Sequence, residues 1–176
     1  MTDRSPVTRE QFSAFVDNNQ LKTLQIIYLA LAMGVSLFLF VIYFLSTQGG
    51  DLPAAEQSSV PTMTIVHFIV LISAIFLSKL IYEKMYSNIP ANVMSTPQII
   101  WQKMKTAHIV RLAILEAPVF LGLVTCLIGV QDGFIPEEPI YWINLTSLVV
   151  FLAFIALSFP NHDRIIQEFR YRFRNN

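Results

Sequence analysis

Four uninterrupted apolar runs, each about as long as a bilayer is thick, dominate this sequence. They extend over Ile26 to Leu45, Met63 to Tyr82, Leu112 to Val130 and Ile140 to Phe159. The hydrocarbon core of a bilayer is about 30 Å thick, and roughly 20 helical residues are needed to cross it. The first and last runs contain no charged residue, and the middle two contain one each. Such a pattern predicts a chain that crosses a membrane four times.

Helices are the expected form of these spans. Lipid offers the backbone no hydrogen-bond partner, so a span is either a helix or part of a closed barrel. These runs lack the alternation of barrel strands, and 14% charged residues is far below the soluble norm of about 25%. We therefore predict an all-α polytopic membrane protein, a single-domain four-transmembrane-helix bundle with cytoplasmic helical extensions. The predicted spans are 24–46, 62–86, 97–130 and 139–160.

The charges outside the spans predict the orientation. All twelve basic residues lie before the first run, around the second connection or after the fourth run, whereas the other two connections hold five acids and no base. Lysine and arginine are enriched in cytoplasmic segments. Residues 1–20 and the basic tail 161–176 are thus expected in the cytoplasm. About 20 mostly polar residues precede the first run, so we expect it to remain in the chain rather than to act as a cleaved signal.

Local patterns predict further helices at the cytoplasmic side. Thr8 to Gln11 matches a capping box and should start a short helix. Thr96 and Pro97 suit a helix start, so one helix of about 51 Å could run from Pro97 to Val130, with Pro118 as a possible kink. Its first turns, with Trp101 and Met104, are expected to pack against Tyr82 and Tyr86.

The tail after Pro160 combines apolar and basic residues at helical spacing. Such a helix suits the surface of an anionic membrane. A solvated tail or a tail that binds a partner protein is the alternative.

Glu116 is the residue that most invites a functional interpretation, because carboxylates inside a membrane are costly and often mark proton, ion or substrate paths. It lies five residues beyond Arg111, about 7.5 Å deeper, and Lys79 reaches a similar depth on the neighbouring span. A structural pair of Lys79 with Glu116 is the favoured interpretation. A proton or ion site, and contact with a ligand or lipid headgroup, are the alternatives. Glu116, Arg111 and Lys79 thus form the candidate intramembrane polar site.

No cofactor or metal is expected from the remaining polar residues. His67 lies near the outer end of its span, whereas His108 and His162 lie at the inner boundary, so a haem held between facing histidines is disfavoured. Cys126 has no second cysteine to pair with. Gly34 and Gly122 each lie four residues from another small residue, a spacing that permits close helix packing. Asn144 is expected to form hydrogen bonds between helices, and a position facing an outer cavity is the alternative.

Several segments resemble a family of small uncharacterised bacterial four-helix inner-membrane proteins. They are residues 21–31, residues 111–118 and the closing Pro160 before Arg164 to Ile166. The resemblance implies a bacterial cytoplasmic (inner) membrane location and no activity. Glu116 to Val124 is also similar to the proton-carrying helix of rotor-ring proteolipids, although the glycine-repeat helix expected beside it is absent.

The expected function is that of a non-enzymatic structural or interaction subunit. Its partners would be the lipid bilayer and either further copies of the chain or another membrane protein, and the zero net charge argues against nucleic acid. The alternative is a small oligomeric transporter that handles protons or ions through Glu116. A membrane enzyme would need His67, His108, Glu116 and Asn144 to converge, and they are scattered in the sequence.

Overall fold

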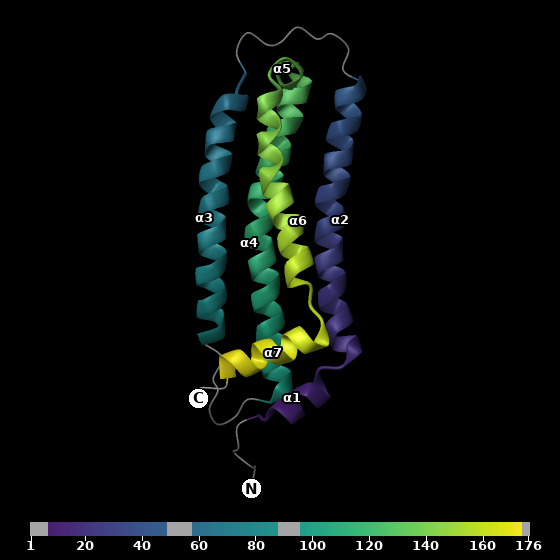
Figure 1. The fold of residues 1–176 in the computed structure, drawn as a ribbon, viewed down its shortest axis with the longest axis vertical. Coiled ribbons are helices and arrows are strands. Elements are labelled where there is room, and N and C mark those ends of the chain that lie inside the picture. Colours follow the sequence, from purple (N-terminus) through teal and green to yellow (C-terminus); the bar gives the residue numbers. More distant parts are fainter. Residues whose placement is uncertain (1–6, 49–57, 88–95, 174–176) are drawn as a thin grey trace.

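The structure is a computed structural model that describes residues 7–48, 58–87 and 96–173 (Figure 1). The described residues form helices and no strand. In chain order these are α1 (Arg9–Phe15), α2 (Asn18–Gln48), α3 (Val60–Ser87), α4 (Pro97–Gln131), α5 (Phe134–Glu137), the 3₁₀ helix η1 (Pro139–Leu145), α6 (Thr146–Ser158) and α7 (His162–Phe173).

The predicted all-α architecture with four spans is confirmed. Four of these segments are long and apolar enough to cross a membrane, namely Asn19–Gln48, Val60–Ser87, Pro97–Gln131 and Pro139–Ser158. Of the twelve bases and five acids that predict the orientation, Arg4, Asp51, Glu56 and Arg174 lie outside the described residues.

The third span is one continuous helix, because α4 runs through Pro118 without interruption. Thr96 precedes it as predicted, with Pro97 in the first turn, although the Thr96 side chain makes no capping hydrogen bond. The fourth span differs from the predicted single α-helix, since it begins as η1 and becomes α-helical at Thr146. Within η1, Asn144 Nδ2 donates to the Tyr141 carbonyl at 2.9 Å. A side-chain donor of this kind competes with regular helical bonding.

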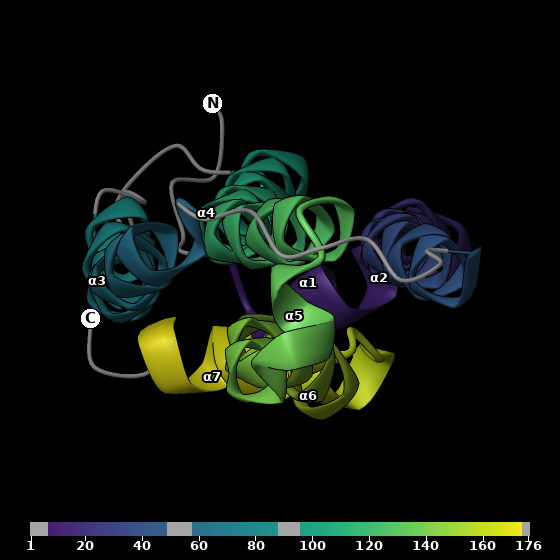
Figure 2. The same ribbon diagram turned by 90° about the horizontal axis from the view of Figure 1, so that it is seen from above.

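The long helices are organised around α4. Seen along the bundle, α4 stands between α2 and α3, and α6 packs against it from a third side (Figure 2). About half of the most apolar window of α4 is buried, compared with 17% for α2 and 22% for α3. The outward faces of α2 and α3 carry large apolar side chains, as helices facing lipid do. The bundle is therefore open between its outer helices.

Two short helices close one end of the bundle (Figure 1). Thr8 caps α1 with the predicted capping box. The rings of Phe12 in α1 and Phe169 in α7 stack with centroids 4.3 Å apart. The apolar face of α7, formed by Ile165, Ile166 and Phe169, is buried in the protein core. The tail thus covers the bundle instead of presenting an apolar face to a membrane surface. We call this the α1/α7 end and the opposite one the α5 end.

Candidate functional site

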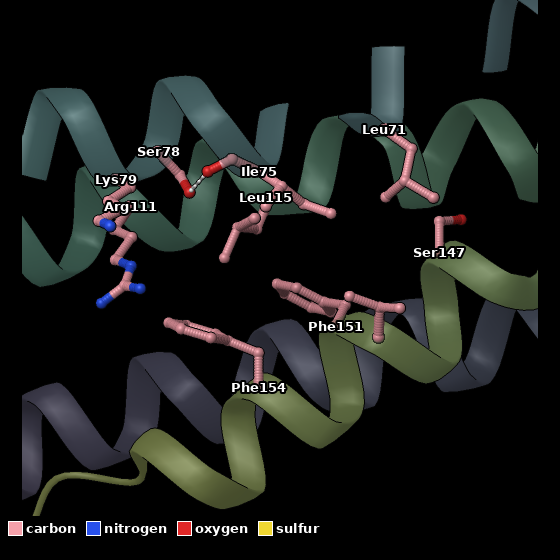
Figure 3. Close-up of a pocket in the computed structure, with 10 residues that line it drawn as sticks. Leu71, Ile75, Ser78, Lys79, Arg111, Leu115, Ser147, Phe151 and Phe154 are labelled. Atoms are coloured by element: carbon pink, nitrogen blue, oxygen red, sulfur yellow. Dashed lines mark hydrogen bonds between the residues drawn. The ribbon is translucent and has the colours of Figure 1, made fainter. Parts of the chain in front are cut away.

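A cavity of about 210 Å³ lies between α3 and α6, with α4 as its floor (Figure 3). Ile75 and Val150 at its mouth are 43% and 38% exposed. The cavity therefore opens on the outer surface of the bundle, where the spans would meet lipid. We call it the lateral groove. Its lining residues are Leu71, Ile75, Ser78, Lys79, Arg111, Leu115, Ser147, Val150, Phe151 and Phe154.

The two basic residues of the groove lie together at its end nearest α1 and α7, and the remaining lining is mostly apolar (Figure 3). Lys79 lies 19 residues from the start of α3, and Arg111 lies 20 residues before the end of α4. At 1.5 Å per residue these lengths are about 28 and 30 Å. They match the thickness of a bilayer core. If the α5 end marks one membrane boundary, Lys79 and Arg111 lie at the other.

Arg111 is held in place by aromatic rings. Its guanidinium carbon lies 4.7 Å from the ring centroid of Tyr82 and 4.6 Å from that of Phe154. Both distances are typical of cation–π contacts. Its Nε atom is buried without a hydrogen-bond partner. Neither Lys79 nor Arg111 makes an ion pair within the part of the chain that the structure describes. Among the described residues, the groove therefore ends in two basic side chains that make no direct ion pair with an acid.

Glu116 is separate from these two bases. It lies on α4 but does not line the groove. It is partly exposed, and among the described residues it makes no ion pair and no side-chain hydrogen bond. The favoured pair of Lys79 with Glu116 is thus not formed. Five residues along a helix correspond to a turn of about 140° from Arg111, which points Glu116 to another side of α4. Of the three candidate residues, the structure brings together Lys79 and Arg111 only.

A buried polar network, which we call the polar latch, joins four helices at the α1/α7 end. It consists of Tyr28 on α2, Tyr82 on α3, His108 on α4 and Glu168 on α7. His108 Nδ1 lies 2.9 Å from the Tyr28 hydroxyl, and His108 Nε2 lies 3.1 Å from Glu168 Oε2. The Tyr82 hydroxyl donates to the other Glu168 oxygen. The same Tyr82 ring contacts Arg111, so the latch and the groove share a wall.

Glu168 carries the charge of the latch and is only 17% exposed. Burial raises the pKa of this carboxyl, but the hydrogen bond and charge of His108 and the hydroxyls of Tyr82 and Tyr86 outweigh burial and lower the pKa below its ordinary value. A carboxylate that accepts several hydrogen bonds is stabilised in its ionised form. The sequence did not single out Glu168, because the tail was expected to lie on a membrane surface with its polar side chains in solvent. Trp101 and Met104 are buried in the same core cluster as Tyr82 and Tyr86, and Trp101 Nε1 also donates to Gln20 at 3.2 Å.

A second polar cluster lies nearer the α5 end, where η1 meets α3 and α4. Asn144 Nδ2 donates to Thr64 Oγ1 on α3 at 2.9 Å, so the expected bond between helices is confirmed. The His67 ring is fully buried, and neither of its nitrogens lies within hydrogen-bonding distance and geometry of a partner among the described residues. Gly122 leaves room for this ring, because a β-carbon there would lie 2.9 Å from His67 Nε2 and 2.4 Å from the Asn144 carbonyl.

The other expected polar groups lie apart. His162 faces Ser13 and Asp163 at the α1/α7 end, at 3.5 and 3.8 Å, and does not join His108. Cys126 is buried in the core. Within residues 7–48, 58–87 and 96–173, no three side chains of His, Cys, Asp or Glu come together as metal ligands would.

The fold and this geometry define a class, that of polytopic four-helix membrane proteins, here with a groove on the outer surface of the bundle. Comparison with protein-family models, curated proteins and solved structures finds no match.

Proposed function

We propose that this chain is a non-enzymatic interaction protein of the bacterial inner membrane, and that it holds a membrane-embedded partner molecule in the lateral groove. The lateral groove supports this proposal most directly. It opens between α3 and α6 on the outer surface of the bundle. It ends at Lys79 and Arg111, which make no ion pair with an acid among the described residues. Unneutralised charge at the edge of a membrane core is costly and is commonly kept for a binding role.

The polar latch supports a binding role over a catalytic one. His108 and Glu168 bond to each other and to the hydroxyls of Tyr28 and Tyr82. General acid–base catalysis needs such groups within reach of a substrate proton. In the polar latch, the hydrogen bonds of His108 and Glu168 connect α2, α3, α4 and α7. These bonds hold the Tyr82 ring beside Arg111. The latch thus supports the wall of the groove.

The distribution of basic residues supports a cytoplasmic position for the α1/α7 end. This end carries Arg9, Lys84 and Arg170, whereas the α5 end carries Asp132, Glu137 and Glu138. Lysine and arginine near short loops stay on the cytoplasmic side. With α1 and α7 at one end, both termini would be cytoplasmic.

Photo-crosslinking inside cells tests the proposed function. A photoreactive phenylalanine analogue would replace Val150, at the mouth of the groove, or Val149, which is 65% exposed and does not line it. The expected result is a discrete adduct at 150 that is absent at 149, identified by mass spectrometry. The same broad set of lipid adducts at both positions would contradict a specific occupant.

A second candidate function, proton or ion handling, is favoured by one observation. Glu116 is a partly exposed carboxylate at membrane depth with no basic partner among the described residues. An oligomer could place it at a subunit interface, and intramembrane acids often mark proton paths. Flux through proteoliposomes that a Glu116→Gln variant abolishes would establish this function. Flux no greater than in empty liposomes would remove it.

A further inference from the structure

The shape of the lateral groove restricts what it can hold. Its volume of about 210 Å³ is below the roughly 300–1,000 Å³ of pockets for whole drug-sized ligands. A transmembrane helix with its side chains is about 10–12 Å across and too wide for this space. Along α3 the groove extends from Leu71 to Lys79, a rise of about 12 Å at 1.5 Å per residue. One leaflet of the core, half of about 30 Å, is of similar depth. A single extended hydrocarbon chain fits these dimensions.

The charged end of the groove restricts the headgroup. With one membrane boundary at the α5 end, Lys79 and Arg111 lie at the other boundary, where lipid phosphates meet the hydrocarbon. Cation–π contacts with the rings of Tyr82 and Phe154 hold the Arg111 guanidinium, and its Nε has no hydrogen-bond partner among the described residues. A guanidinium fixed in this way is preorganised for a phosphate or carboxylate. Lys79 adds a second, flexible positive charge. Because neither base makes an ion pair within the described part of the chain, the two favour a ligand of net negative charge over a zwitterion.

We propose that the lateral groove binds one anionic phospholipid from the leaflet that meets the α1/α7 end. The phosphate lies against Lys79 and Arg111, and one acyl chain follows Ile75, Leu115 and Phe151 toward Ser147. This assignment rests on the proposed function, that the groove has a specific occupant, and names its chemical class.

Native mass spectrometry of the purified full chain tests the assignment. The protein is equilibrated in detergent with equal amounts of phosphatidylglycerol and phosphatidylethanolamine, and the lipid retained per protein is measured. We expect one phosphatidylglycerol per chain. A Lys79→Gln/Arg111→Gln variant should lower the retained ratio of the anionic to the zwitterionic lipid roughly tenfold, since each charge-assisted contact is lost. Lys84→Gln/Lys105→Gln, with the same loss of charge at the same end, should leave the ratio unchanged.

A second pair of variants tests the groove without altering charge. Val150→Trp should fill the mouth of the groove and displace the lipid, whereas Val149→Trp, on the adjacent residue outside the groove, should not. Because both tryptophan variants keep Arg111, they still test lipid binding in the groove if the variant without Arg111 does not fold.

The outcomes separate the two proposals. Retention of phosphatidylethanolamine as strongly as phosphatidylglycerol, or equal losses in the two charge variants, would overturn the anionic-lipid assignment while leaving an occupant of the groove. Equal retention by the two tryptophan variants would place the lipid outside the groove. Excess inorganic phosphate should not compete, because it lacks the chain; competition by phosphate alone would show an anion site without a lipid.

Discussion

At the scale of single residues, two glycines in similar sequence surroundings have different roles. Gly34 and Gly122 both lie four residues from another small residue, a spacing that predicts close helix packing for each. Nothing lies within 4 Å of a β-carbon built on Gly34, whereas one on Gly122 meets the Asn144 carbonyl at 2.4 Å. Of these two glycines, only Gly122 lies at a close helix contact. The spacing of small residues could not predict this difference, because it does not say which side of a helix faces a neighbour.

This difference predicts opposite effects of the same substitution. Gly122→Ala should destabilise the protein by about 1–3 kcal/mol, since the contact is with backbone that cannot rotate away. Gly34→Ala should be neutral or stabilising by up to about 1 kcal/mol, because alanine is the better helix former. Unfolding in detergent, followed by circular dichroism, measures both. Equal effects at the two positions would contradict the close contact between Gly122 of α4 and the Asn144 carbonyl of η1.

Two glutamates show the limit of prediction from the sequence. Glu116 stands out because it is the only charge in an apolar run, and such isolation is visible in the sequence. Glu168 is surrounded by charged and polar neighbours in the tail and looks solvated, yet it is the glutamate that bonds His108 and Tyr82. Its burial depends on α7 folding back across the bundle. The alternation of Ile165, Ile166 and Phe169 with polar residues was the available signal, and it does not distinguish a lipid surface from a protein surface.

At the scale of elements, α7 is a helix whose place is set by both packing and charge. Its apolar residues pack in the core with Phe12, and Glu168 joins it to α3 and α4. Because the folded protein lowers the pKa of Glu168, the ionised carboxylate stabilises the fold. This contribution is present above the ordinary carboxyl pKa of about 4.3 and is lost as the pH falls through the lowered value.

The latch therefore predicts a stability that depends on Glu168 in acid. At pH 7, Glu168→Gln should lower the stability by about 1–3 kcal/mol, the usual value of hydrogen bonds to a charged group. The wild type should lose stability as the pH falls below about 4, and the variant should lose less. Thermal unfolding in detergent from pH 7 to pH 3 measures this, with the exposed Glu83→Gln as control. Identical pH profiles for wild type and Glu168→Gln would exclude a charged latch.

The long helices were the most predictable elements, because the length of an apolar run and the thickness of a bilayer set their bounds together. The predicted span 97–130 corresponds to α4, Pro97–Gln131, and the span 62–86 corresponds to α3, Val60–Ser87. The 3₁₀ start of the fourth span was not predictable, since the apolar run from Ile140 to Phe159 does not distinguish a 3₁₀ helix from an α-helix. The lateral groove was not predictable either, because it results from how far apart α3 and α6 stand on α4.

At the scale of the whole molecule, the helices α1 and α7 lie at the same end of the bundle as the basic residues of the described segments. This arrangement predicts that the α1/α7 end is cytoplasmic. A cysteine at Ser59, near the α5 end, should react with a membrane-impermeant maleimide in intact cells whose outer membrane is permeable to it. A cysteine at Ser87, at the opposite end of α3, should react only after the inner membrane is opened. The native Cys126 is buried and serves as the unreactive background. The reverse labelling pattern would invert the topology.

The central claim is that α3 and α6 stand apart on α4 and hold an anionic lipid between them. Its most direct test is an electron cryomicroscopy map of the full chain, bound to an antibody fragment, in nanodiscs that contain phosphatidylglycerol. We expect elongated density in the groove, with a phosphate within about 4 Å of Lys79 and Arg111 and a chain that reaches the level of Ser147. A map in which α6 closes against α3 and leaves no space between Ile75 and Phe151 would contradict it.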